Sequence, residues 1–363
     1  MTVTLRTDSE TTIAVVSEGP HINTVNLRSY LDPLVDGGLD GELTAHLIAG
    51  GRSNPTYELS DGSRSWVLRR PPHGLVLPTA HDMGREYRIL TALRDTVVPV
   101  PATVGLSYDE DIIGAPFYVM EKLDGVTFRT HEQTAELTHA ERKGFSDTMI
   151  HTLAALHGVD IAAVGLTDWG KPDGFLERQL RRWRRQWEGA HTNERAEVDE
   201  LLNRLTRSLP VTRFPGIVHG DYKVDNLMVD TFDPRKILGV LDWEMSTLGD
   251  TLADLGVMIS FWDEPGDLFN PISAGTTAHE GFGTRDEAVQ KYAQIRDIEI
   301  ADIDWYIVFA DFKIAVILEG IHTRHVQGHT VGADFEGIGD MVGPLLDRAL
   351  ERASASSHHA LRA

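Results

Sequence analysis

One short stretch of the chain, from His219 to Asn226, holds side chains that together could transfer a phosphoryl group. Its sequence is His-Gly-Asp-Tyr-Lys-Val-Asp-Asn, and Asp242 follows sixteen residues after its end. Phosphoryl transfer needs a carboxylate to orient the attacking hydroxyl, ligands for magnesium, and cations around the phosphates. Asp221 fits the first role. Asn226 and Asp242 fit the second, because hard magnesium prefers oxygen ligands.

The spacing within this stretch points to the same chemistry. Asn226 lies five residues after Asp221, the separation found in protein-kinase catalytic loops, where the Asp accepts the substrate proton and the Asn holds a metal. Lys223, two residues after Asp221, is predicted to be catalytic by touching the transferred phosphate, and a solvated turn lysine is its alternative. For the whole stretch, the alternative is an ordinary acidic turn.

The residues after Asn226 favour the catalytic alternative because they predict a β-hairpin. Residues 227–229 are expected to form one strand, residues 230–235 a turn, and residues 237–241 the return strand. Such a hairpin carries Asp242 back toward Asn226. Two metal ligands then lie at the ends of adjacent strands, which a random acidic turn would not arrange.

Three more polar residues near this stretch are expected to support it rather than react. His219 ends an apolar strand, where a histidine is more often a hydrogen-bonded structural residue than a base. Asp250 and Asp254 could be metal ligands by type, but we predict that they cap the following helix and brace the catalytic loop.

The elements upstream of this stretch predict a β-sheet with helices. Leu27, Tyr30, Leu31 and Leu34 recur at helical spacing, and Gly37-Gly38 ends that helix. Further elements expected before residue 122 are strands at 42–48, 56–59 and 65–69, a helix at 81–94 and a strand at 117–120. From about residue 132 onward helical periods dominate.

This order predicts an α+β protein of two lobes. The expected divisions are a loose arm over 1–22, a small β-rich lobe over 23–122, a hinge near Glu121 to Gly125, a larger helical lobe over 123–355, and a frayed tail over 356–363. Gly50, Gly51, Ser53 and Asn54 form a short turn in the first lobe. Its glycines would let backbone N–H groups approach the phosphates of a nucleotide, whereas an ordinary hairpin loop is the alternative.

These motifs resemble those of the aminoglycoside phosphotransferase family, whose fold is similar to that of protein kinases. The resemblance is carried by His-Gly-Asp-Tyr-Lys-x-Asp-Asn-Leu, and by Val-Leu-Asp-Trp-Glu-x-Ser-x-x-Gly-Asp-x-x-x-Asp-Leu from Val240. The glycine turn and the strand Leu68-Arg-Arg-Pro-Pro72 are most similar to the kinase-like domains attached to some acyl-CoA dehydrogenases, and to their free-standing bacterial relatives. The similarity covers roughly residues 27 to 350.

The resemblance implies ATP and Mg²⁺ as cofactors and adds residues to the nucleotide site. The position of Arg69 holds a cation that grips the phosphates and pairs with a helix glutamate, here Glu86. Glu121 and Leu123 of the hinge are expected to contact the nucleotide as well. Arg69 departs from the family, because most such kinases carry a lysine there and a planar guanidinium occupies different space. Arg70 is expected to be a solvent-exposed charge on the opposite face of the strand.

The resemblance implies a phosphotransferase with a small-molecule hydroxyl as acceptor. Too few residues separate Asp242 from Asp250 for the long segment with which protein kinases dock a peptide. A non-catalytic nucleotide-binding protein is a further alternative, although all the catalytic-loop groups are present.

The acceptor is predicted only by analogy. The similarity to acyl-CoA dehydrogenase-linked domains implies a hydroxy acid or a hydroxyacyl-CoA, and aminoglycosides are the alternative. The helix from Trp305 to Arg324 is expected to wall the acceptor site; up to Gly320 its only acids are Asp311 and Glu319, and it also carries Lys313.

The composition is that of an ordinary globular protein. With 41% hydrophobic and 25% charged residues, a formal charge of -21 and no cysteine, the chain is not expected to bind nucleic acid or to form disulfides. It shows neither a membrane span nor a signal peptide, so we expect a cytoplasmic location. The arginine-rich run 178–187 has an apolar stripe of Leu176, Leu180, Trp183 and Trp187, which predicts that its arginines face solvent.

Overall fold

A computed structural model of the chain describes residues 22–48, 54–72, 82–267, 270, 272–328 and 337–362. The chain forms two compact units, Met1–Thr91 with Pro101–Leu123, and Ala92–Val100 with Asp124–Ala363. The predicted α+β class is confirmed. The expected arm lies outside the described residues except for its last residue, Ile22. None of the described helices is long and apolar enough to cross a membrane.

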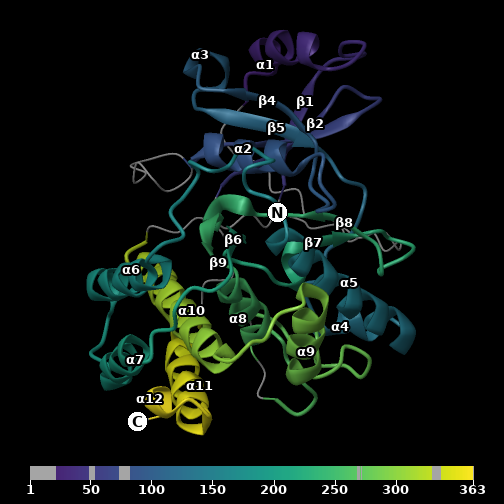
Figure 1. Ribbon diagram of the computed structural model, residues 1–363. Helices are drawn as coiled ribbons and strands as arrows, with labels where there is room; N and C mark the ends of the chain where they lie inside the picture. Colours follow the sequence, from purple (N-terminus) through teal and green to yellow (C-terminus); the bar gives the residue numbers. More distant parts are fainter. Residues whose placement is uncertain are drawn as a thin grey trace, which may run out of the picture. The chain divides into compact units, whose positions relative to one another are not determined.

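The first unit is built on one antiparallel sheet with the strand order β1-β2-β3-β5-β4. Figure 1 shows α1 and α3 on one side of this sheet and α2 on the other. Leu27 and Leu31 of α1 pack against Leu59, Leu68 and Phe117 of the sheet in one apolar cluster. The elements are α1 Thr24–Leu31, β1 Thr44–Leu47, β2 Thr56–Ser60, β3 Ser65–Arg69, α2 Met83–Leu93, β4 Thr103–Ser107, α3 Glu110–Ile113 and β5 Phe117–Glu121.

The second unit is mainly helical, with α10 packed between α8 and α11 (Figure 1). Two small antiparallel sheets, β6 with β9 and β7 with β8, carry the loops of interest. Its helices are α4 His131–Ala135, α5 His139–His157, α6 Phe175–Ala190, α7 Ala196–Arg207, α8 Leu252–Ser260, α9 Arg285–Arg296, α10 Ile303–Val326, α11 Val342–Ala355 and α12 His359–Arg362. Its strands are β6 Pro215–Val218, β7 Leu227–Val229, β8 Ile237–Val240 and β9 Thr247–Asp250.

The segment Ala92–Val100 belongs to the second unit, although the sequence placed it in the first. Its Pro99 carbonyl accepts a hydrogen bond of 2.8 Å from the N–H of Val240 at the end of β8. Val98 is buried. The segment therefore lies against the end of β8 in the second unit.

The C-terminal tail also differs from the expectation of a frayed end. Residues His359–Arg362 form α12, and Leu361 is fully buried. The carbonyl of Arg362 accepts a hydrogen bond of 3.0 Å from Arg204 of α7. The burial of Leu361 and the hydrogen bond to the Arg362 carbonyl thus hold this segment on the second unit, although its composition predicted no structure.

Candidate active site

The segment from His219 to Asn226 connects β6 to the hairpin of β7 and β8. Its turn depends on Gly220, which has φ +89°, and a side chain there would meet the carbonyl of Met245 at 2.7 Å. A short 3₁₀ helix, Val224–Asn226, follows and delivers Asn226 to the start of β7. The local geometry thus requires glycine before the aspartate and turns the chain back within a few residues.

Asp221, Lys223 and Asn226 lie together within hydrogen-bonding distance. The Lys223 ammonium donates to Oδ2 of Asp221 at 2.8 Å, and the Asn226 amide nitrogen donates to the same oxygen at 3.0 Å. The amide also donates to the Asp221 carbonyl at 2.8 Å. Both of these side-chain donors reach Oδ2, which leaves Oδ1 as the oxygen that can receive a proton from an acceptor.

Lys223 is held by charge as well as by geometry. Its ammonium also lies 3.7 Å from Asp225 and 5.3 Å from the centre of the Phe261 ring. Burial alone would lower the pKa of Lys223, but the charges of Asp221 and Asp225 outweigh burial and raise the pKa above its ordinary value. The Lys223 side chain therefore stays protonated beside Asp221 at neutral pH. The alternative of a solvated turn lysine is wrong, because the ammonium is paired.

The hairpin brings Asp242 back toward Asn226, as the sequence predicted. The N–H of Leu241 donates to the carbonyl of Asn226 at 2.9 Å, so Asp242 follows directly after a residue paired with the other candidate ligand. The backbone of Asp242 is left-handed, with φ 64°. Such a conformation is strained for any residue but glycine and is often found at functional sites.

The donor set fits magnesium. Because the nitrogen of the Asn226 amide points to Asp221, its oxygen is the end available to a cation, and Asp242 offers a carboxylate. Among the residues that the structure describes, no cluster of three or more His, Asp or Glu side chains forms a closed metal cage. Magnesium usually takes one or two protein carboxylates together with waters and substrate phosphates.

Asp254 of α8 braces the catalytic loop from behind. Its two carboxylate oxygens accept the N–H groups of His219 at 2.6 Å and of Gly220 at 2.7 Å, and His157 of α5 lies 3.2 Å from Oδ2. Burial by itself would raise the pKa of Asp254, but these partners and their charges lower it. The predicted bracing role is confirmed.

Asp250 is not the N-cap of α8 as predicted, because Thr251 holds that position, but it bonds the start of the helix. It accepts the N–H of Leu252 at the start of α8 at 3.1 Å, and the hydroxyl of Tyr306 at 2.8 Å. His219 is fully buried, and its ring nitrogens bond the carbonyl of Leu241 at 2.9 Å and the N–H of Asp221 at 3.2 Å. These contacts agree with the structural role expected for His219.

Lys313 of α10 is a loop partner that the sequence did not reveal. Its ammonium donates to the Gly220 carbonyl, and its side chain is almost fully buried. Burial lowers the pKa of Lys313 to about 8, although the charges of Asp221 and Asp254 act in the opposite direction. The loop is thus held through its N–H groups by an acid and through a carbonyl by a lysine.

In the first unit, Arg69 and Glu86 form the predicted ion pair. Their charged atoms lie 2.8 Å apart, and the side chains are 11% and 1% exposed, so the pair is shielded from water. Glu86 also accepts the hydroxyl of Tyr118 and the amide of Asn54, each at 2.9 Å. Burial, and then the charge of Glu86, raises the pKa of Tyr118 well above its ordinary value.

Of the other residues predicted to bind the nucleotide, some lie outside the described residues and two lie at the end of the first unit. Gly50, Gly51 and Ser53 lie outside the described residues. Glu121 ends β5, where its N–H donates to the Ala102 carbonyl at 2.7 Å, and Leu123 is the last residue of the first unit. Their contacts with a nucleotide remain predictions.

Arg70 corrects the expectation of a solvent-exposed charge. Its side chain is 2% exposed, and its guanidinium donates to the carbonyls of Pro71 and Ile113, each at 3.3 Å. The end of α3 covers this side of the strand. The alternation of side chains along a strand predicts the face of the sheet on which Arg70 lies. It does not predict whether another element covers that face.

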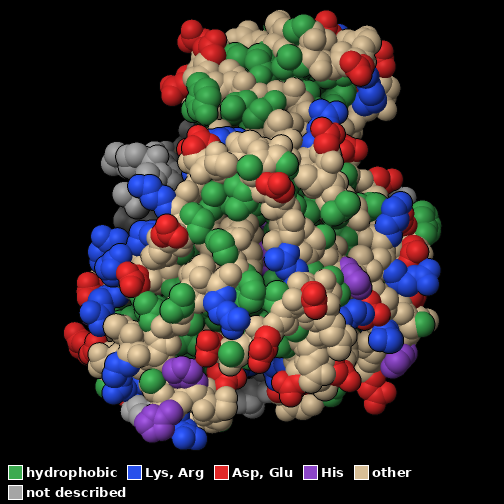
Figure 2. Space-filling view, viewed as in Figure 1, with side chains coloured by type: hydrophobic (Ala, Val, Ile, Leu, Met, Phe, Trp, Pro, Cys, Tyr) green, Lys and Arg blue, Asp and Glu red, His purple; other side chains and the backbone are tan. Residues whose placement is uncertain are grey.

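The arginine-rich helix α6 behaves as its periodicity predicted. Leu176, Leu180, Trp183 and Trp187 are buried, whereas Arg181, Arg182 and Arg185 are exposed. Blue side chains gather over this helix at the left of Figure 2.

Asp311 and Glu319 of α10, on the helix expected to wall the acceptor site, bond partners within the protein. Asp311 is fully buried and bonds Arg348 and Arg352 of α11, each at 2.6 Å. Glu319 accepts the N–H of Thr192 at 2.6 Å and its hydroxyl at 2.8 Å. Both carboxylates are engaged within the protein, Asp311 by arginines of α11 and Glu319 by Thr192, which lies between α6 and α7. Their role at an acceptor remains a prediction.

Comparisons with known proteins agree with this geometry. Residues 44–294 match a model described as the phosphotransferase enzyme family. Acyl-CoA dehydrogenase family member 11 of Gallus gallus is 33% identical over 333 residues, which is 89% of this chain and 42% of that protein. The chain therefore spans less than half the length of this relative.

Solved structures are similar over nearly the whole chain. A crystal structure from Ralstonia eutropha, provisionally named an aminoglycoside phosphotransferase, is 33% identical with a TM-score of 0.79, covering 92% of this chain and 98% of its own. A thermostable aminoglycoside phosphotransferase APH(4)-Ia, solved with AMP-PNP and hygromycin B, is 14% identical with a TM-score of 0.59, covering 91% and 99%. The second likeness concerns the fold alone.

Proposed function

We propose that this chain, which belongs to the phosphotransferase enzyme family, is a small-molecule kinase that moves the γ-phosphoryl group of ATP to a hydroxyl of its acceptor. The observation that supports this most is the cluster of Asp221, Lys223 and Asn226, with Asp242 returned beside it by the hairpin. It offers an oriented carboxylate, a cation and two oxygen ligands, which are the parts that phosphoryl transfer requires.

In the proposed reaction, Oδ1 of Asp221 takes the proton of the acceptor hydroxyl. The hydroxyl oxygen forms a bond to the γ-phosphorus as the bond from that phosphorus to the bridging oxygen breaks, and ADP leaves. Lys223 and Asn226 hold Asp221 through Oδ2, so its other oxygen keeps a fixed direction. Asn226 and Asp242 would hold Mg²⁺, which offsets negative charge on the phosphate oxygens.

Arg69 is proposed to grip the nucleotide phosphates. Its guanidinium already lies against Glu86 in a buried pair, and Asn54 and Tyr118 fix that glutamate. A bidentate cation held in this way suits phosphate oxygens. Gly50, Gly51, Ser53, Glu121 and Leu123 complete the nucleotide site in this proposal.

For the acceptor we propose a hydroxy acid or a hydroxyacyl-CoA rather than an aminoglycoside. The relative of Gallus gallus is a member of the acyl-CoA dehydrogenase family, which makes an acyl compound the natural class to test. An aminoglycoside carries several ammonium groups and needs converging carboxylates. The two acids of the segment Trp305–Gly320 are both committed to internal partners.

A competition assay tests this choice of acceptor. Turnover of kanamycin-type compounds, hydroxy acids and hydroxyacyl-CoA esters is compared in one ADP-release assay, with mass spectrometry of the products. We expect the acyl compounds to have the larger kcat/KM. An aminoglycoside value of about 10⁴ M⁻¹s⁻¹ or above, in the ordinary enzyme range, would overturn the choice.

A further inference from the structure

The peptide group between Gly220 and Asp221 decides where the proposed base points. Gly220 has φ +89°, and a side chain there would meet the carbonyl of Met245. Glycine permits this conformation, but it also permits others at little cost. A rotation of the peptide group would turn the main chain of Asp221 and redirect its carboxylate. The glycine that allows the turn therefore does not by itself hold the peptide group in one orientation.

Lys313 and His219 hold this peptide group from its two sides. The Lys313 ammonium donates a hydrogen bond to the Gly220 carbonyl. The N–H of Asp221 donates to Nδ1 of His219 at 3.2 Å. Among the described residues, no other group donates to the Gly220 carbonyl. Loss of the ammonium would therefore free one side of the peptide group.

Lys313 reaches the loop from the middle of α10, far along the chain. This helix packs against α8 and α6. The Lys313 side chain is 7% exposed, and its ammonium lies 5.8 Å from the centre of the Trp183 ring of α6. Burial of an ammonium is unfavourable unless its partners offset the lost hydration. A lysine buried at this place, with a carbonyl of the catalytic loop as its partner, indicates a role beyond packing.

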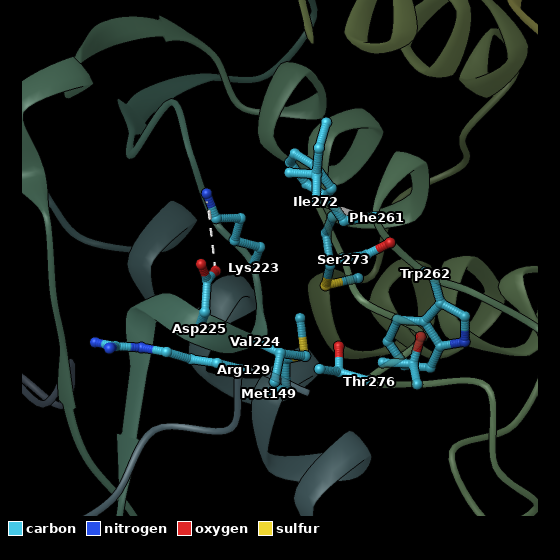
Figure 3. A pocket seen from close by; sticks show the side chains of 12 residues that line it. Arg129, Met149, Lys223, Val224, Asp225, Phe261, Trp262, Ile272, Ser273 and Thr276 are labelled. Carbon is cyan, nitrogen blue, oxygen red and sulfur yellow. Dashed lines mark ion pairs between the residues drawn. The ribbon is translucent and has the colours of Figure 1, made fainter. Parts of the chain in front are cut away.

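Lys223, the other lysine at the loop, has different partners. Figure 3 shows its ammonium turned toward Asp225, and the dashed line marks their ion pair of 3.7 Å. The ammonium also donates to Oδ2 of Asp221 at 2.8 Å. Lys223 thus bonds carboxylates of the loop, whereas Lys313 bonds its backbone. The two lysines therefore hold different parts of Asp221, one its carboxylate and the other its main chain.

The charge of Lys313 depends on pH in the range in which enzymes are assayed. Burial lowers the pKa of Lys313 to about 8. The charged groups that face it come from the loop, from α8 and from α6: Asp221, Lys223, Asp254 and Arg182. The acids among them raise this pKa and the cations lower it. A hydrogen bond from a charged donor is about twice as strong as one between neutral groups, so the bond to Gly220 weakens as the pH rises above about 8.

We propose that Lys313 is a positioning residue for phosphoryl transfer, because its ammonium keeps the peptide group of Gly220 and Asp221 in the orientation that aims the Asp221 carboxylate at the acceptor hydroxyl. The inference rests on the proposed function and adds a residue to it. In this role Lys313 contacts neither ATP nor the acceptor and acts only through the loop backbone. Its loss should therefore lower kcat and leave the affinities for both substrates nearly unchanged.

The variant Lys313→Met tests this role. Methionine keeps an unbranched apolar side chain but cannot donate to the Gly220 carbonyl. With a medium-chain hydroxy acid, or with its coenzyme A thioester, kcat should fall about 10- to 100-fold, as for the loss of other outer partners. Kd for MgATP should stay within about twofold of the parent. An unchanged kcat, or a change confined to KM, overturns the proposal.

Val308→Ala is the matched control for a weakened α10. Val308 is a buried residue of the same helix, and its apolar side chain offers the loop no hydrogen bond. We expect kcat per folded molecule to stay within about threefold of the parent in this variant. Equal losses of kcat in Val308→Ala and Lys313→Met would show that packing of the helix matters and not the ammonium, which contradicts the proposal.

Hydrogen exchange measured by mass spectrometry tests the same contact without an acceptor. In Lys313→Met the backbone N–H groups of residues 217–222 should exchange faster than in the parent, whereas those of α9 keep their parent rates. Unchanged exchange at the loop would show that Lys313 does not hold it. Equal acceleration throughout the second unit would show a loss of stability alone. Either result overturns the proposal.

A comparison of activity and stability over pH separates positioning from stabilisation. The ratio of kcat in the parent to kcat in Lys313→Met should fall as the pH rises from about 7 to about 9, because the parent loses its ammonium there. The stability of the parent relative to this variant should rise over the same range, since the cost of burying the charge disappears. A lysine that only affects stability would leave the ratio of kcat constant, and a constant ratio contradicts the positioning role.

The positioning role and the proposed reaction fail in different ways. If Lys313→Met keeps the parent kcat while Asp221→Asn loses phosphate transfer, Lys313 is not a positioning residue and the proposed reaction stands. If Asp221→Asn leaves phosphate transfer unchanged, the proposed reaction itself is wrong, and the positioning role falls with it whatever the exchange at the loop shows.

Discussion

The catalytic loop of the second unit and the Arg69–Glu86 pair of the first unit are held in different ways. In the loop, the N–H groups of His219 and Gly220 bond Asp254, and the Gly220 carbonyl bonds Lys313. In the first unit, by contrast, Arg69 faces Glu86 at 2.8 Å in a pair that is shielded from water. The backbone of the loop is thus fixed by side chains of α8 and α10, whereas Arg69 is held through its charged side chain.

This difference matches the two roles proposed for these groups. A displacement of about 1 Å in a reacting group can reduce a rate about 100-fold, so the base proposed at Asp221 needs a loop that is held closely. The cation proposed to grip the phosphates needs a partner that orients its guanidinium, and Glu86 is such a partner.

Asp221→Asn tests the loop side of this difference and should have the largest effect. The amide preserves the shape of the carboxylate but cannot take the acceptor proton, so kcat should fall about 10²- to 10⁴-fold. MgATP affinity, measured by calorimetry, should stay near the parent value. The assigned role is wrong if the variant turns over its acceptor at the parent rate.

Asp254→Asn tests whether the hydrogen bonds from Asp254 to the catalytic loop contribute to the rate of the reaction. The new amide keeps one acceptor oxygen, but its NH2 group would face the N–H of either His219 or Gly220, so one of the two hydrogen bonds to the loop is lost. Loss of such an outer partner typically costs about 10- to 100-fold in activity, and we expect that loss in kcat per folded molecule. Asp250→Asn is the control, since Asp250 bonds the N–H of Leu252 and the hydroxyl of Tyr306 rather than the loop; equal kcat losses in both variants would leave the brace unsupported.

Asp242→Ala should act on the metal rather than on the base. Removing one oxygen ligand should weaken the magnesium-dependent part of ATP affinity by about tenfold or more, by analogy with the cost of losing outer metal partners. Titration of the nucleotide at several magnesium concentrations measures this. Unchanged magnesium dependence would remove Asp242 from the site.

Arg69→Lys should have a small effect on activity. Lysine keeps the charge opposite Glu86, and relatives in the family use it, although it loses the planar guanidinium. We expect kcat/KM for ATP to stay within about tenfold of the parent, whereas Arg69→Met should lose more. If lysine and methionine are equally harmful, the charge is not what Arg69 contributes.

The smallest effect is a change of stability with pH that comes from Lys313. Its pKa is about 8 in the folded protein and 10.5 ordinarily, so below pH 8 the fold bears the full cost of a buried ammonium. That cost falls as the pH rises above 8 and is gone above about 10.5, where the unfolded lysine also loses its proton. The urea midpoint of the parent, relative to Lys313→Met, should therefore rise from about pH 7 to about pH 10. A constant difference would contradict the lowered pKa.

The sequence predicted the local parts of the site and missed the distant ones. The hairpin after Asn226, the return of Asp242 and the bracing by Asp254 could be predicted because turn residues and short spacings specify them. Lys313 and His157 could not, because they lie 93 and 97 residues from the groups they contact. Only the packing of α10 and α5 brings them to the loop.

The errors have the same physical origin. Arg70 was expected in solvent because a strand shows which face a residue occupies but not that α3 covers it. The sequence likewise did not show that arginines of α11 engage Asp311 of the helix expected to wall the acceptor site. The family resemblance predicted the reaction from local motifs, and it gave no equivalent motif for the acceptor site.

The most direct test of the central claim is the balance between ADP and phosphorylated acceptor. The hydroxy acid, or its coenzyme A thioester, is incubated with MgATP and the protein, and both products are quantified by mass spectrometry in the parent and in Asp221→Asn. The account predicts one phosphorylated acceptor for each ADP in the parent, and almost none in the variant. Formation of ADP without phosphorylated acceptor, or equal product in both proteins, would contradict it.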